Sequence, residues 1–297
     1  MANFRFLHES SRSTRAVVPD LQQSCTQRDT ARNDHESMGR MAKRFKNFKR
    51  FVYDYEVETL NGVKGATTFQ NGPKVSCKVE IEVPQTCSFI LRTKDCSLTE
   101  VTDIHAQGTP VFSPAAGSEA FKVAMAKNTL TFVVDIENEV SLYPEEGEPI
   151  SILNAKRGII SALMVPAMEE DKTRGMTTVH GECATDFTVN SGDAADVTVN
   201  RDLSKCNNHS PQREPTSPLA LITGMHYPLS KLIASTQTCN YKFDASKKHM
   251  VSTNCTEKHL FLPFSSQNKY GMSTTVSQTL TLRESNKIND RIFNYSE

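Results

Sequence analysis

The chain has 297 residues, and its 34 basic side chains balance its 34 acidic ones. This balance gives no electrostatic reason to expect nucleic acid as a partner, and no apolar run approaches the roughly 20 residues of a membrane-spanning helix. Hydrophobic residues make up 37% of the chain, which is enough for a real core in one large β domain or two smaller ones.

The N-terminal segment differs in character from the rest of the chain. Residues 1–40 are polar and show neither helical nor strand periodicity, so we expect a disordered or atypical tail there. The opening MANFRFLHESSRSTRAVV lacks the basic start, apolar core and cleavage site of a secretory signal. Order is expected to begin near Lys43.

Strand patterns dominate the remainder. In residues 75–83, apolar side chains alternate with Lys78, Glu80 and Glu82, and this period of two predicts a half-buried strand. The C-terminal stretch Met272–Leu282 has the same period and is long enough to cross a large sheet. In chain order, the expected strands are Arg50–Val57, Val75–Val83, Ser88–Arg92, Leu130–Ile136, Pro149–Leu153, Met176–Cys183, Asp186–Asn190, Asp196–Asn200, Cys239–Asp244, Leu260–Phe264 and Met272–Leu282.

Helix patterns are few. Ser118–Lys127 is expected to be a helix with Ser118 as its N-cap. Lys156–Val165 has one apolar side and stops at Pro166, and Leu229–Thr236 is a shorter candidate. Many strands with two or three isolated helices predict a mainly β fold, either a large antiparallel β-barrel or a strongly curved sheet. One helix is expected in its mouth or lumen, with one or two short extra helices.

The eight cysteines could form a metal site, a reactive centre or covalent bridges. Structural zinc sites use ligands in close pairs, but the chain has no C-x-x-C, and Cys255 with His259 is an isolated C-x3-H. A cysteine nucleophile needs a positioned base, and the His180-Gly-Glu-Cys183 segment lacks the P-C-x-x-C partner of zinc deaminases. No nucleophile elbow, P-loop or dinucleotide motif occurs. The sequence therefore predicts no enzyme, no metal site and no cofactor.

Disulfides are the favoured interpretation, because the cysteines form an even set at the ends and middles of expected strands. Closing a short loop stabilises a chain by about 3 kcal/mol in the chain-entropy model, and such bonds persist in oxidising compartments. The alternative is eight reduced cysteines acting as small core hydrophobes. Short loops suggest the pairs Cys77–Cys96, Cys183–Cys206 and Cys239–Cys255, leaving Cys25 with Cys87.

A basic run, KRFKNFKRF, precedes the first expected strand. It could bind a polyanion such as heparan sulphate, or it could be a solvated face leading into the strand. The candidate contacts are Lys43, Arg44, Lys46, Lys49 and Arg50.

Three N-glycosylation sequons occur, at Asn208, Asn254 and Asn294. Asn208 and Asn294 are the candidate acceptors. At Asn254 the middle residue of the sequon is Cys255, so a disulfide there would compete with modification.

Four long strings carry a family resemblance: CKVEIEVPQTCSFILRTKDCSLTE, LYPEEGEPISILNAKRGIISALMVP, SPLALITGM and KHLFLPFSSQNKYGM. From about Lys43 to Phe293, in the same order and with few gaps, the chain closely resembles the N-terminal domain of the large lipid transfer proteins, in the branch of apolipoprotein B and the vitellogenins. The resemblance implies a lipovitellin-like antiparallel β-barrel over residues 41–293 with the KRGIISALMVP helix in its lumen. It also implies that this barrel begins a longer protein, whose helical and lipid-pocket domains are absent from this chain.

The resemblance further implies a non-enzymatic lipid-transport role. It suggests a secreted module that passes through the endoplasmic reticulum lumen and docks with the microsomal triglyceride transfer protein during lipoprotein assembly, with lipid as cargo of the whole protein. It implies the same three short-loop disulfides. The family's fourth bridging cysteine precedes the position of Arg44, where this chain has Ser37-Met38-Gly39, so Cys25 is the candidate partner of Cys87. The alternative from another class is a secreted glycan-binding, heparin-binding or adhesion module without a lipid role.

Overall fold

The computed structural model describes residues 48–64, 70–105, 108–134, 140–164, 172–178, 181–189, 196–203, 206, 233–244, 249–261 and 271–288. The tail expected at residues 1–40 lies outside these ranges, as do most of the basic run and the sequons at Asn208 and Asn294.

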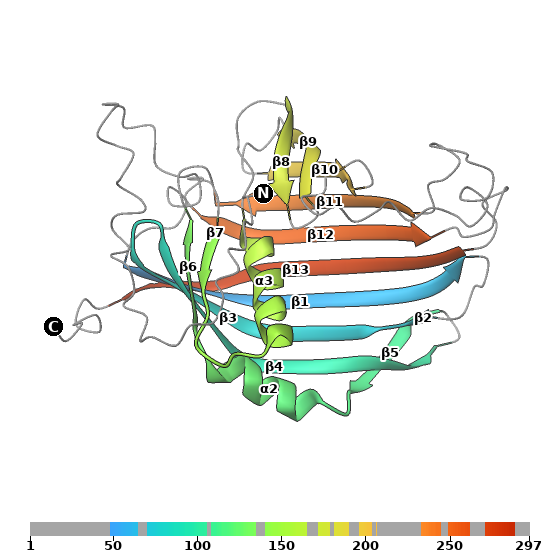
Figure 1. Cartoon of the computed structure of the whole chain (residues 1–297), viewed down its shortest axis with the longest axis horizontal. Helices are drawn as coiled ribbons and strands as arrows, with labels where there is room; N and C mark the ends of the chain where they lie inside the picture. The colour runs from blue at the N-terminus through green and yellow to red at the C-terminus, as the bar shows by residue number, and fades with distance from the viewer. Residues whose placement is uncertain are drawn as a thin grey trace.

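One large antiparallel sheet organises the described part of the chain (Figure 1). Its strand order is β7-β6-β4-β3-β1-β13-β12-β11-β10-β9-β8, with β2 beside β1 and β5 beside β4. The first and last strands pair at the centre over their whole length, from Lys49 opposite Lys287 to Lys64 opposite Gly271. The strands are β1 (Lys49–Lys64), β2 (Gln70–Asn71), β3 (Pro73–Gln85), β4 (Ser88–Ile104), β5 (Pro110–Pro114), β6 (Leu130–Val134), β7 (Val140–Tyr143), β8 (Lys172–Thr178), β9 (Gly181–Val189), β10 (Asp196–Asp202), β11 (Ile233–Phe243), β12 (Met250–Phe261) and β13 (Gly271–Lys287).

The alternation predicted for β3 is confirmed. Cys77, Val79 and Ile81 are buried, while Lys78 between them is exposed. The buried side chains point to the face on which the helices pack, which we call the inner face; the opposite face is the outer face. A side chain outside this pattern is Glu82, which is on the outer face and yet is only 4% exposed.

Helix α2 (Ser118–Lys127) has the predicted bounds. Its N-cap residue is Gly117, however, so the expected cap at Ser118 is wrong. The Ser118 hydroxyl accepts a hydrogen bond from the Leu98 N–H at 3.2 Å and so ties the helix to β4.

Helix α3 (Ile150–Leu163) begins six residues before the expected start. Pro149 is its N-cap, and Ile152 and Leu153 are buried in its first turn, so the strand expected at Pro149–Leu153 is wrong. A short apolar run cannot by itself distinguish a strand from a buried helix turn. The third expected helix is also wrong where it is described, because Ile233–Thr236 belongs to β11.

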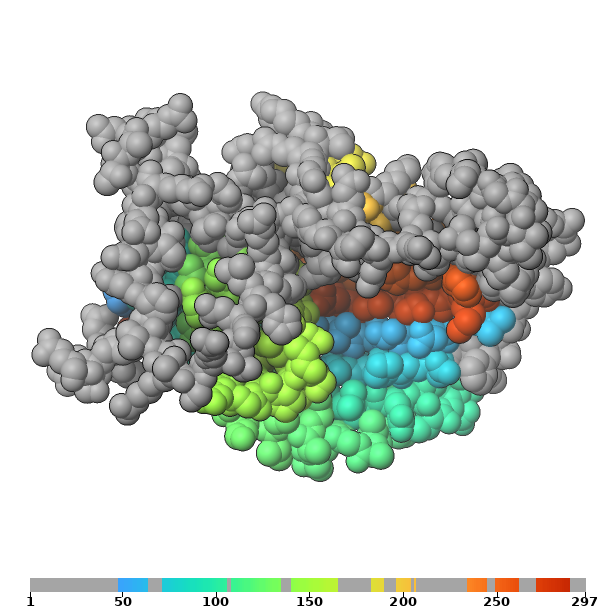
Figure 2. Space-filling view, in the orientation of Figure 1, coloured from blue at the N-terminus to red at the C-terminus, as the bar shows by residue number. Residues whose placement is uncertain are grey.

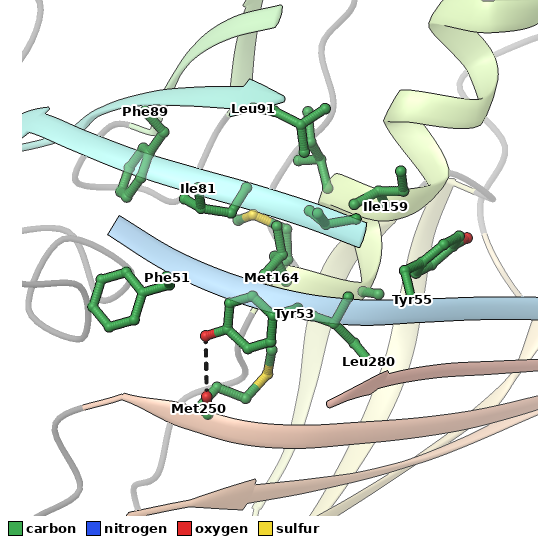
Figure 3. Packing of buried hydrophobic residues seen from close by; sticks show 14 of the residues in the cluster. Phe51, Tyr53, Tyr55, Ile81, Phe89, Leu91, Ile159, Met164, Met250 and Leu280 are labelled. Carbon is green, nitrogen blue, oxygen red and sulfur yellow. Dashed lines mark hydrogen bonds between the residues drawn. The ribbon is translucent and has the colours of Figure 1, made fainter. Parts of the chain in front are cut away.

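The core lies between the inner face and α3, as Figure 3 shows. Ile159 and Met164 from the helix region pack there with strand residues such as Phe51 and Ile81. The buried Tyr53 hydroxyl donates a 3.0 Å hydrogen bond to the Met250 carbonyl, which joins β1 to the start of β12. Burial raises the pKa of Tyr53, because the phenolate would be poorly solvated there.

The mainly β class, the antiparallel sheet and the helix on its inner face are confirmed, but closure into a barrel is not seen. Within the described residues no ladder joins β7 to β8, and the sheet keeps two edges. Its strands shorten from 16 and 17 residues in β1 and β13 to four in β7 and seven in β8. Edges this short offer few backbone groups for the continuous ladder that closure requires.

Candidate functional site

The inner face is the candidate functional surface because α3 covers only part of it. Beyond the helix, β1 and β13 continue and place Val63 directly opposite Met272. These two apolar side chains are 45% and 58% exposed. Figure 2 shows this part of the sheet, coloured blue for β1 and orange-red for β13, at the surface beside α3.

A small cavity of about 200 Å³ lies where the two helices meet the uncovered part of the sheet. Its walls come from β1, β3, α2 and α3 and are mostly apolar. An apolar cavity of this order can hold a small hydrocarbon group. The lining residues are Tyr55, Val57, Thr59, Pro73, Val75, Met125, Ala155 and Ile159.

One polar contact beside the cavity holds α3 to the sheet. The Gln278 side-chain amide donates to the Tyr55 hydroxyl at 2.9 Å and to the Gly158 carbonyl at 3.0 Å. Burial raises the pKa of Tyr55 to about 12, although the hydrogen bond from Gln278 acts in the opposite direction. The phenol is therefore neutral at physiological pH and serves as a fixed polar anchor in an apolar wall.

A buried ion pair holds the other side of α3. The Lys156 ammonium group donates to the Asn128 carbonyl at 2.8 Å and to the Glu148 carboxylate, and both charged side chains are essentially inaccessible. Removing one member of a buried pair leaves an uncompensated charge. The sequence pattern did not reveal this contact, because it marks Lys156 only as the first residue of an amphipathic helix.

The inner face of the C-terminal half carries a chain of hydrogen bonds across β9–β12, which we call the polar row. Arg201 donates to Thr185 at 3.1 Å and to Gln237 at 2.6 Å, and Gln237 donates to Glu257 at 3.0 Å. Burial lowers the pKa of Arg201, while the nearby Glu257 carboxylate opposes this shift. The row consists of Thr185, Arg201, Gln237, Glu257, His259 and Ser235.

The last three members of the polar row are residue types found in hydrolytic triads. His259 lies 2.5 Å from Glu257 through Nε2 and 2.8 Å from the Ser235 hydroxyl through Nδ1. Ser235 is only 7% exposed, and its hydroxyl is engaged with His259 Nδ1. This arrangement is a structural cross-link between β11 and β12.

The outer face of the N-terminal half carries cross-strand ion pairs. Glu82 lies 2.7 Å from Arg50 and 3.6 Å from Arg92, and Glu80 lies 2.8 Å from Lys94. The basic partners are 39% to 56% exposed, whereas the Glu82 and Glu80 side chains are only 6% and 12% exposed, so water reaches these pairs mainly from the basic side.

The outer face of β10–β13 has an uncharged centre by contrast. Eight side chains form two directly paired rows across the four strands, and we call them the hydroxyl–amide grid. Thr198 donates to Asn240 at 2.9 Å, and Thr238 donates to Asn200 at 2.8 Å. One row is Thr198, Asn240, Asn254 and Thr279, and the other is Asn200, Thr238, Thr256 and Ser277.

The cysteines form covalent bridges. The structure contains the three short-loop disulfides, Cys77–Cys96, Cys183–Cys206 and Cys239–Cys255. Cys87 is disulfide-bonded as well, and it lies in the β3–β4 turn with a positive φ of 69°. Its expected partner, Cys25, lies outside the described residues.

The candidate polyanion contacts are only partly described. Lys43, Arg44 and Lys46 lie outside the described ranges, and Lys49 begins β1. Arg50 uses both Nε and Nη2 to donate to Glu82, at 3.0 and 2.7 Å. The described basic residues therefore do not form a group of uncommitted cations.

In the described ranges, no three or more His, Cys, Asp or Glu side chains are grouped so as to hold a metal ion. None of the helices described has the length and apolar character needed to cross a membrane.

Comparison with known proteins identifies the family. Residues 45–290 match the vitellogenin N-terminal domain, so the chain belongs to that family. It is 46% identical over 257 residues to human apolipoprotein B-100, and 45% identical over 257 residues to the rat protein. Both matches cover 85% of this chain but only 6% and 5% of the relatives, so the chain corresponds to a small part of their length.

More distant similarities fit the same family. The chain is 23% identical over 168 residues to a vitellogenin of the sturgeon Acipenser transmontanus, covering 55% of this chain and 10% of that protein. A solved structure described as lipid–protein interactions in lipovitellin aligns with a TM-score of 0.66 at 18% identity. That match covers 82% of this chain and 26% of the other, and it shows the fold.

Proposed function

We propose that this chain is a non-enzymatic lipid-transport module that takes part in the assembly of lipoprotein particles. The observation that carries the proposal is the 46% identity to human apolipoprotein B-100 over 257 residues. The family resemblance suggests that the module docks with the microsomal triglyceride transfer protein while lipid is loaded. It also suggests passage through the endoplasmic reticulum lumen and secretion, and the three disulfides fit an oxidising compartment.

The uncovered inner face supports a contact with lipid or with an apolar partner. Val63 and Met272 expose apolar side chains further along the same face from a cavity whose walls are mostly apolar. Removing such surface from water contributes about 25 cal/mol per Å². The outer-face ion pairs and the hydroxyl–amide grid present charged or hydrogen-bonding groups instead, so the inner face is the better surface for this contact.

A flotation experiment tests the lipid part of the proposal. Secreted protein is mixed with phosphatidylcholine–triolein emulsion particles, and the floating fraction is compared between wild type and the Val63→Asp, Met272→Asp double variant. We expect flotation to fall several-fold in the double variant. Thr275→Asp is the matched control, because its side chain is on the outer face of the same strand, β13. Equal flotation of the two variants would contradict the assignment of the inner face.

Docking is tested separately by co-precipitation with the microsomal triglyceride transfer protein. The same two variants show which face carries the contact. Loss of binding in the inner-face variant, with binding retained in Thr275→Asp, supports docking through the uncovered inner face. Retention in both variants places the contact elsewhere, and failure of the wild type to bind would refute the docking part.

Heparan sulphate binding through the basic run is the competing proposal. Arg50 argues against it within the described part, because the side chain is already paired with Glu82. Elution of the wild type from heparin at low salt, unchanged by alanine at Lys43, Lys46 and Lys49, would remove this alternative. A salt-sensitive interaction abolished by those substitutions would favour it.

A further inference from the structure

We infer that Asn254 carries an N-linked glycan on the outer face of β12. Asn254-Cys255-Thr256 is an acceptor sequence for this modification. The objection from sequence is that Cys255 lies inside it and forms a disulfide. In the folded strand, however, the disulfide and a glycan on Asn254 do not compete for the same space.

The bridge and the acceptor lie on opposite faces of the sheet. Cys255 and its partner Cys239 are paired directly across β11 and β12 and are 4% and 0% exposed on the inner face. Asn254 is the next residue along the strand and is exposed on the outer face. A glycan on Asn254 therefore projects into solvent, and the folded chain accommodates both modifications.

The surroundings of Asn254 have room for a sugar. Its direct cross-strand neighbours are Asn240 and Thr279, and Thr256 follows it on the same face. All belong to the hydroxyl–amide grid, so they are small, uncharged and able to hydrogen-bond to sugar hydroxyls. On the N-terminal half, the equivalent outer-face positions hold long charged side chains that are already paired with one another.

The transfer must precede formation of the β11–β12 ladder, because a residue in the middle of a 12-residue paired strand cannot enter an enzyme's active site. In the reaction, the Asn254 amide nitrogen forms a bond to C1 of a lipid-linked oligosaccharide. The C1–oxygen bond to the lipid diphosphate breaks, the diphosphate leaves with the electron pair, and the amide proton passes to a base of the transferase. The disulfide therefore competes with the glycan in time, since Cys239 and Cys255 are 16 residues apart and can pair early.

This inference rests on the secreted location in the proposed function, and it adds a constraint to it. A glycan at Asn254 keeps the outer face of β11–β13 in water. Lipid and partner proteins would then contact the inner face or the charged half of the outer face.

The test is a glycan map of the chain expressed in a eukaryotic cell behind a supplied secretion signal, with a C-terminal Asn-Gly-Thr reporter. The signal takes the chain into the lumen whatever its native route, so the result on Asn254 is separate from the proposed native location. Occupancy is read in cellular and secreted protein by enzymatic deglycosylation, which converts a modified Asn to Asp, and by peptide mass spectrometry. We expect Asn254→Gln and Thr256→Ala each to lose one glycan, and Asn240→Gln on the same face to lose none.

A modified reporter with Asn254 wholly unmodified would overturn the inference. The Cys239→Ser variant separates the causes, because it removes the competing bridge and leaves the acceptor sequence intact. If Asn254 is modified only in that variant, disulfide formation wins in the native chain, and the inference fails for the native protein. Substantial occupancy in wild type that rises further in Cys239→Ser supports both the site and the proposed order of events.

Discussion

The two halves of the sheet differ in the face that carries charges near the middle of the strands. In β1, β3 and β4 the inner face is aromatic and aliphatic, and charged pairs such as Glu80–Lys94 lie on the outer face. In β9–β12 the inner face contains Arg201 and Glu257 within the polar row, while the outer face has the uncharged hydroxyl–amide grid.

This difference shows that strand alternation does not decide which chemical class is buried. An outer-face pair such as Glu80–Lys94 keeps its basic partner in water, so we expect it to contribute less to stability than a fully buried pair. A buried charge needs hydrogen bonds from its neighbours to offset the lost hydration, and Arg201 forms them through Nε and Nη1. We therefore expect substitutions in the polar row to cost far more than substitutions among the outer-face pairs.

The largest effect is expected for Arg201→Ala. It removes the donor to Thr185 and Gln237 and leaves Glu257 without a nearby buried cation. We expect the free energy of unfolding to fall by about 3–5 kcal/mol, measured by urea denaturation with the disulfides intact. If Arg201→Ala lowered the free energy of unfolding by less than the outer-face substitution Lys94→Ala does, the expected difference between the two halves would be wrong.

Disulfide removal should affect the two halves almost equally. Cys77–Cys96 and Cys239–Cys255 close loops of similar size, with sequence separations of 19 and 16. Replacing either pair by Ser should cost about 3 kcal/mol in the chain-entropy model. Thermal unfolding of the two double variants checks this, and a large difference between them would show that local contacts outweigh loop closure.

High pH should destabilise the folded chain, because the phenols buried on the inner face resist ionisation. The pKa of Tyr55 is about 12 in the folded chain, against 10.0 as its ordinary value. The unfolded chain therefore loses this proton first, and the contribution to stability, complete below pH 10, is lost as the pH rises toward 12. We expect a fall of about 1.4 kcal/mol per pH unit from this group.

Tyr55→Phe should make the free energy of unfolding less dependent on pH in this range, by the contribution of one titrating proton. The variant also loses the hydrogen bond from Gln278, so its stability is compared with its own value at neutral pH. An identical slope in wild type and variant between pH 10 and 12 would show that Tyr55 ionises normally in the folded chain.

The smallest effects are expected on the outer face. Lys94→Ala removes a partly exposed pair with Glu80 and should cost about 0.2–1 kcal/mol, less at high salt. Thr238→Val in the hydroxyl–amide grid loses one neutral hydrogen bond to Asn200, with a cost of about 1 kcal/mol or less that does not depend on salt. The free energy of unfolding of both variants is measured at increasing salt concentration. Equal salt dependence of the two losses would contradict the contrast between charged and uncharged outer faces.

Much of the sheet could be predicted because strand alternation is a local signal. The period of two in β3 and β13 marked both strands, and loop length suggested the three described disulfides. Helix α3 was only partly predicted, because the apolar run before Lys156 fits a strand as well as a buried helix turn. The buried pair of Lys156 with Glu148 left no sequence signal, since charged residues near a helix are usually solvated.

The class of the protein can be read from its amino acids: a mainly β chain with bridged cysteines and long strings shared with the vitellogenin N-terminal family. Tertiary structure alone decided the pairing of β1 with β13, the burial of the polar row and the uncovered part of the inner face. These features differ in how far apart in the sequence the contributing residues lie. Alternation and loop length are set by residues close in the chain, whereas each of these features depends on side chains brought together from distant strands.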